Sequence, residues 1–176
     1  GDLLANLSVN SFPLTPIGNY LGTSLAGSLS AKGQISGPIS SLNTNLSIGV
    51  VNPQISGIRL QEEWHGDLIG DSRGADLKIS SIGASVPSTF SANFDRNWLL
   101  NDVLIQRLGG SVSLKRSKDL FLWRAENFRL DRIEVAIPPE QRFKRIFGQL
   151  NGSGNFGFNP IRLDSQLTVR YPRYMG

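Results

Sequence analysis

Alternation of apolar and polar residues with a period of two runs through nearly the whole chain. Residues 42–50, LNTNLSIGV, place leucine, threonine, isoleucine and valine at every second position, with asparagine, serine and glycine between them. Successive side chains of a strand point to opposite faces, so this period predicts strands, and the 3.6-residue period of a helix is almost absent. The chain is therefore expected to be all-β, with about ten to twelve strands. Their hairpin-like spacing indicates antiparallel pairing.

Glycine and proline divide this pattern into strands, and two segments depart from it. Residues 13–22 are compatible with a single helical turn, and residues 139–147 are expected to form a short helix because Phe143, Ile146 and Phe147 have helical spacing. The predicted turns lie at Gly37-Pro38, Asn52-Pro53, 70–74, Val86-Pro87, Gly109-Gly110, 117–119, Pro138-Pro139 and Asn159-Pro160.

Each expected strand has one apolar face, which another layer or the sheet itself must cover. A second sheet would give a sandwich, and self-closure a barrel. We expect the third arrangement, in which residues 1–176 form one elongated, lengthwise-curled antiparallel sheet (a β-taco) with an apolar concave face. The residues expected to line that groove are Leu7, Val9, Leu25, Leu29, Ile35, Leu46, Ile48, Leu77, Ile79, Phe90, Phe94, Val112, Leu114, Phe121, Trp123, Leu150, Phe156, Leu167 and Val169.

An internal similarity supports a repetitive sheet. Residues 25–48 and 146–169 superpose with a constant offset of 121, which pairs Gly27 with Gly148 and Gly33 with Gly154. Both copies alternate cleanly. Glycine at these positions is interpreted as giving the concave face width and the freedom to bend. The abrupt ends of the chain indicate a piece of a longer protein.

The sequence offers little catalytic chemistry. GSGNFG at 152–157 matches a dinucleotide fingerprint literally, but the glycines lie within strand alternation and no helix follows. Glu63, His65 and Asp67 can share one strand face, yet His65 is the only histidine and there is no cysteine. We therefore expect no enzyme activity, no metal site and no cofactor.

The basic charge is concentrated in the second half of the chain. Residues 89–176 hold 14 Lys/Arg against 8 Asp/Glu, whereas residues 1–88 hold 4 against 6, and the charges of the two halves sum to the net charge of +4. A basic half can meet an acidic partner, anionic lipid or nucleic acid. The cluster at 115–124 interleaves aromatic and basic residues, but alternation places Trp123 and Arg124 on opposite faces, which argues against stacking of nucleic-acid bases.

The paired stretches resemble TamB-type proteins of the AsmA-like superfamily. The composition of the chain is similar to that of cyanobacterial members and their chloroplast-envelope relatives. The similarity rests on the phrase LAGSLSAKGQISGP at 25–38, on the alternating strand that follows it, and on the shorter phrase LGGSVSL at 108–114. It covers most of residues 1–171 and includes no catalytic motif.

The resemblance implies a non-enzymatic segment of a protein anchored in the inner membrane and spanning the periplasm or the envelope intermembrane space. Its apolar groove would carry phospholipid acyl chains toward the outer membrane, together with an outer-membrane barrel of the TamA type. A related mechanism would shield unfolded outer-membrane protein strands by strand addition. The alternative is a closed β-sandwich, either an adhesin or a carbohydrate-binding module, with its function in the loops.

Overall fold

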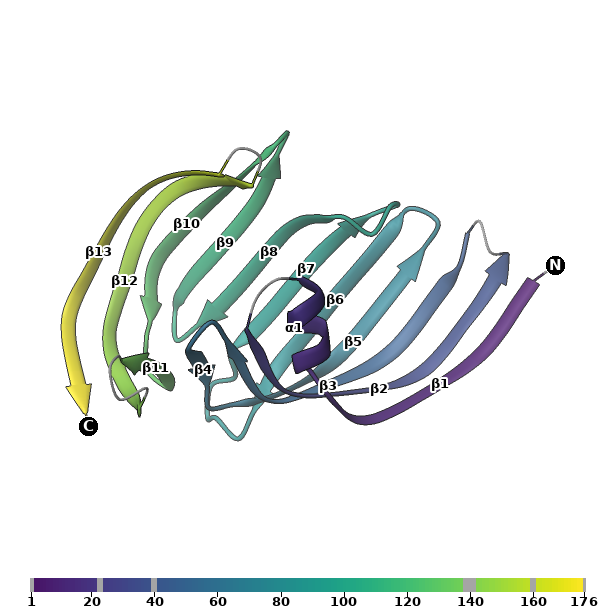
Figure 1. The fold of residues 1–176 in the computed structure, drawn as a ribbon, viewed down its shortest axis with the longest axis horizontal. Coiled ribbons are helices and arrows are strands. Elements are labelled where there is room, and N and C mark those ends of the chain that lie inside the picture. The colour runs from purple at the N-terminus through teal and green to yellow at the C-terminus, as the bar shows by residue number, and fades with distance from the viewer. Residues whose placement is uncertain (1, 22–23, 39–40, 138–141, 159–160, 176) are drawn as a thin grey trace.

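The computed structural model describes residues 2–21, 24–38, 41–137, 142–158 and 161–175, and it joins thirteen strands into one antiparallel sheet. The sheet is curled, and a single short helix, α1, lies beside β2 (Figure 1). The elements are β1 (Asp2–Pro13), α1 (Thr15–Leu21), β2 (Leu25–Pro38), β3 (Asn43–Ile55), β4 (Ile58–Leu60), β5 (Glu63–Asp71), β6 (Gly74–Ile82), β7 (Thr89–Asp95), β8 (Leu100–Arg107), β9 (Gly110–Ser117), β10 (Leu120–Arg129), β11 (Ile133–Ile137), β12 (Arg142–Phe158) and β13 (Ile161–Met175).

Two long strands, β3 and β12, each share one edge between two partners. β3 pairs with β5 over Thr44–Val50 and with β4 over Gln54–Ile55. β12 likewise pairs with β10 and, nearer its start, with β11. Because β4 also pairs with β11, the hydrogen-bonded strands form a ring that runs from β3 through β5–β10 to β12 and back through β11 and β4.

The long strands bend at one level, which we call the crease. Register shifts mark it in the β1–β2, β2–β3, β10–β12 and β12–β13 pairs. A β-bulge inserts an extra residue and bends the strand. The crease is defined by the residues with positive φ at these bulges, which are Ser11, Gly27, Asn52, Asn127, Gly148 and Tyr171.

Glycine is required where neighbouring strands come unusually close. A Cβ built on Gly33 would lie 2.0 Å from the carbonyl oxygen of Asn45, and one on Gly154 would lie 2.2 Å from that of Asp164. Glycine at positions 33 and 154 therefore allows the sheet to bend sharply toward the face on which these two residues lie. The side chains on that face are apolar, so the apolar face is the concave one.

Two sequence-based expectations for secondary structure were wrong. Residues 142–147 are the start of β12 and not a helix, because β11 pairs with them from Ile133↔Ile146 to Ile137↔Arg142; residues 139–141 lie outside the described part of the chain. Asn52-Pro53 is not a turn, since β3 continues through it as a bulge. The helix expected within 13–22 is confirmed as α1, and the predicted all-β curled sheet is confirmed.

The sheet leaves much surface exposed. The accessible surface is 11,628 Å² for a chain of 19.2 kDa, whereas a compact monomer of this mass exposes about 8,400 Å². No large side chain among the described residues is fully buried. A single curled layer accounts for both observations, and the part of the chain that the structure describes forms no closed two-sheet sandwich, because all thirteen of its strands belong to one sheet.

Candidate functional site: the apolar concave face

The cross-strand register arranges the apolar side chains into continuous rows. One row runs from Leu7 through Leu46 and Leu77 to Trp123, and each member is paired directly with the next strand. The full row is Leu7, Gly33, Leu46, Leu68, Leu77, Ala92, Val103, Leu114, Trp123, Gly154 and Ser165. It crosses eleven strands without a charged residue.

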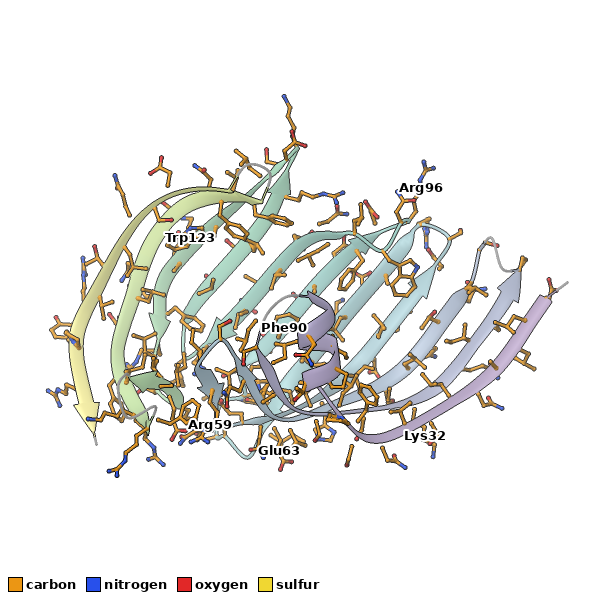
Figure 2. All side chains as sticks on the ribbon, viewed as in Figure 1. Lys32, Arg59, Glu63, Phe90, Arg96 and Trp123 are labelled. Atoms are coloured by element: carbon orange, nitrogen blue, oxygen red, sulfur yellow. The ribbon has the colours of Figure 1, made fainter. Side chains whose placement is uncertain are left out.

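Parallel rows flank this one. The row nearer the crease is Val9, Ala31, Ile48, Gly66, Ile79, Phe90, Ile105, Val112, Ala125, Gly152 and Leu167. The row farther from it includes Ile35, Phe94, Phe121 and Phe156, and the last two rings stack with centroids 5.4 Å apart. Phe90 and Trp123 point to the side that the sheet encloses, whereas Lys32 and Glu63 point outward (Figure 2).

The structure brings the predicted groove residues together. Leu29, Leu150 and Val169 lie at the crease, where Leu29 pairs with Val50 and Leu150 with Val169. Leu25 lies beyond the Gly27 bulge, opposite Ile55. The other fifteen occupy the three rows, which are Leu7, Val9, Ile35, Leu46, Ile48, Leu77, Ile79, Phe90, Phe94, Val112, Leu114, Phe121, Trp123, Phe156 and Leu167.

The opposite face is polar. Ser47 donates a hydrogen bond to Asp67 at 3.1 Å, and Asn93 donates one to Asp76 at 3.0 Å across neighbouring strands. Lys32, Asp67 and Lys78 fall on one row of this face, and all three are exposed. The sheet is therefore amphipathic across its thickness, with water on one side.

The crease glycines do not provide the free space that the sequence suggested. The position of a Cβ on Gly27 is 2.6 Å from the carbonyl oxygen of Asn52, and on Gly148 it is 2.7 Å from that of Arg170. Backbone already occupies these positions. The expectation that the glycines widen the groove was wrong, whereas their role in bending is supported.

A buried polar cluster fills the gap where β5–β8 end inside the ring of strands. Arg107 donates to the Ser88 hydroxyl at 3.1 Å, to the Asp131 carbonyl at 2.5 Å and to the Glu62 carboxylate. The side chains of Arg107 and Glu62 are each only 3% exposed. A cavity of about 60 Å³ adjoins the cluster, which is room for water.

A second polar cluster joins β4, β11 and β12. Glu134 accepts hydrogen bonds from Arg59 and Gln61, both at 2.6 Å, and lies 3.7 Å from Arg145. The Arg59 guanidinium also stacks 4.1 Å from the centre of the Phe143 ring. Neither cluster was anticipated, because each depends on residues far apart in the sequence, 45 residues for Arg107 and Glu62 and 75 for Arg59 and Glu134, and no local pattern connects them.

The other candidate sites are ordinary parts of the sheet. Glu63, His65 and Asp67 lie along the outer face of β5, and no group of three or more metal-ligating side chains occurs among the described residues. The GSGNFG glycines lie inside β12, not before a helix. Arg116 of the basic cluster pairs with Asp95 at 2.8 Å, and Arg124 with Glu126 at 2.7 Å.

Comparison with known proteins finds no matching family model, no matching curated protein and no matching solved structure. Within the part of the chain that the structure describes, no helix is long and apolar enough to cross a membrane.

Proposed function

We propose that this chain is a non-enzymatic segment of a lipid conduit, in which the concave face accommodates phospholipid acyl chains. The observation that carries the proposal is the uncharged row from Leu7 to Ser165, which continues across eleven paired strands on one face of a single-layer sheet. Among the described residues, no second sheet covers it. A surface of this kind has a physical use only if something apolar contacts it.

Acyl chains fit this surface chemically. Each methylene group kept from water is worth about 0.8 kcal/mol. A continuous apolar strip lowers the cost of moving a chain along it without a tight binding site. The half-buried side chains Leu77, Ile79 and Phe90 present aliphatic and aromatic carbon without hydrogen-bonding groups, which suits a ligand that has none.

The wider setting of this proposal follows the resemblance to TamB-type proteins. In that setting the full protein is anchored in the inner membrane, spans the periplasm or envelope intermembrane space and works with an outer-membrane barrel of the TamA type. Shielding of unfolded outer-membrane strands is the related mechanism. Photo-crosslinking from position Phe90 separates the two, since it would capture phospholipid in one case and nascent barrel protein in the other.

The direct experiment compares Ile48→Asp with Ser47→Asp. These neighbours lie on opposite faces of β3, so both variants add the same charge to the same strand. Ile48→Asp places a carboxylate in the apolar row and is expected to reduce co-purified phospholipid, measured by mass spectrometry, at least tenfold. Ser47→Asp is expected to leave it unchanged.

Each protein is also tested for uptake of a fluorescent phospholipid from vesicles. Circular dichroism and small-angle scattering show whether both variants keep the fold. Equal lipid loading of two folded variants would disprove an acyl-chain role for the concave face.

A further inference from the structure

Three strands at one end of the sheet repeat three strands at the other. The Leu14 N–H donates to the Gly27 carbonyl at 3.0 Å, and the Leu130 N–H donates to the Gly148 carbonyl at the same distance. The Ser11 N–H donates to the Ser30 hydroxyl at 3.1 Å, and the Asn127 N–H donates to the side-chain oxygen of Asn151 at 2.9 Å. The bulges in β1 and β10 are thus built with the same contacts.

The register confirms that the two units correspond strand by strand. Val9↔Ala31 and Phe12↔Leu29 become Ala125↔Gly152 and Phe128↔Leu150 when β1 is offset by 116 residues and β2 by 121. The third strand, β3, corresponds to β13 with an offset of 119 residues. With this offset the pair Leu29↔Val50 becomes Leu150↔Val169, and Asn52 superposes on Tyr171; the φ angles of these two residues are 50° and 54°. β1–β2–β3 therefore corresponds to β10–β12–β13.

This correspondence exposes one difference, at the outer edge of the third strand. The edge of β3 is filled by β5 and β4, whereas β13 pairs only with β12 among the described residues. Residues 164–173 of β13 are exposed throughout. We propose that the outer edge of β13 is a strand-docking site for a polypeptide segment with the pattern of β4 and β5.

Two cavities support this assignment. One, of about 610 Å³, is lined by Ala26, Gly27, Asn52 and Gln54 together with residues of β4. The other, also about 610 Å³, is lined at the corresponding positions by Phe147, Gly148, Tyr171 and Arg173. In the first unit β4 forms a wall of the cavity. In the second unit Arg129 and Asp131 complete the lining from the β10 side instead, and no described residue forms a wall at the outer edge of β13.

The residues of β13 define the chemistry of the partner. Leu167 and Val169 correspond to Ile48 and Val50, so the partner must present apolar groups toward them and polar groups toward Gln166 and Thr168. Arg173 stands where β3 has Gln54, which faces Arg59 of β4. An acidic residue is therefore favoured in place of Arg59.

The test appends a copy of residues 58–82 directly after Gly176, which the offset of 119 aligns with Gly57. The absence of native cysteine allows disulfide trapping. Cysteines at Gln166 and at the copied Asp67 reproduce the geometry of Ser47 and Asp67, which are direct partners in β3–β5. That internal pair, replaced by cysteines in a separate protein, is the positive reference and shows whether the parent sheet is folded.

In-register trapping is expected within threefold of the internal reference and at least tenfold above a control that pairs Gln166 with the copied His65. Changing the copied Arg59 to glutamate is expected to increase the trapped fraction. Leu167→Lys is expected to reduce it, because an inward charge protects a sheet edge, while Thr168→Lys leaves it unchanged. Equal trapping in both registers, or disulfide dimers through position 166, would overturn the proposal; dimers would assign the edge to a second copy instead.

Discussion

Arg107 and Glu62 form an ion pair in which both side chains are 3% exposed, at the place where four strands end inside the ring. Replacing one partner leaves a buried charge without compensation, which costs about 3–5 kcal/mol. Glu62→Leu is therefore expected to lower the free energy of unfolding by that amount in urea denaturation. Arg107 also loses the acceptor that positions it against Ser88.

The double variant Glu62→Leu/Arg107→Met is expected to recover most of this loss, because apolar residues of similar volume carry no desolvation penalty. Arg73→Ala is the control, since its pair with Asp71 is at the surface and the Arg73 side chain is 88% exposed. That change is expected to cost less than about 1 kcal/mol. Equal losses at Glu62 and Arg73 would contradict a structural role for the buried pair.

The distance between neighbouring strands predicts different responses from two glycines of the same hairpin. Gly33→Ala forces a methyl group against the Asn45 carbonyl, and we expect it to destabilise the sheet by about 1–3 kcal/mol. Gly49→Ala meets only the His65 ring, at 3.3 Å, which can rotate away. We expect its stability to stay within about 0.5 kcal/mol of the parent. Thermal unfolding of the two variants measures the difference, and similar values would argue against close backbone approach at Gly33.

Asp95 predicts a specific dependence on acid. Backbone N–H groups of Leu99 and Asn97 and the Arg116 side chain donate to its carboxylate, and these bonds hold the pKa of Asp95 below its ordinary 3.8. A depressed folded-state pKa gives stability that is complete above the unfolded value and is lost as pH falls through the folded value. Asp95→Asn is expected to be less stable than the parent at pH 7 and to approach it below about pH 4.

Urea unfolding at pH 7, 5 and 3 measures this convergence. Asp102→Asn serves as the control, since Asp102 is an exposed carboxylate on the adjacent strand β8. A constant difference between Asp95→Asn and the parent across this range would show that the hydrogen bonds to Asp95 do not depend on its charge.

Alternation alone identified most strands and the apolar face, because side-chain direction in a strand is set locally by the period of two. The prediction failed where pairing between strands outweighs the local spacing of apolar residues. Phe143 and Ile146 have helical spacing, yet the same residues fit a strand that β11 can pair with. The internal similarity with an offset of 121 located both hairpins. It placed the second strand of the hairpin two residues out of register, because the length of a hairpin is decided by its turn. Glu62 and Arg107 meet only through the closed ring of strands.

The last prediction concerns overall shape. The exposed surface is about 1.4 times that of a compact monomer of this mass, as a one-layer sheet requires. The radius of gyration in small-angle scattering is therefore expected to exceed the ~16 Å of a compact 176-residue domain. Measurement over a tenfold range of concentration separates an elongated monomer, whose value stays constant, from edge-to-edge dimers, whose value rises. A constant value near 16 Å would mean that the sheet closes on itself in solution and buries the rows that the lipid proposal needs exposed.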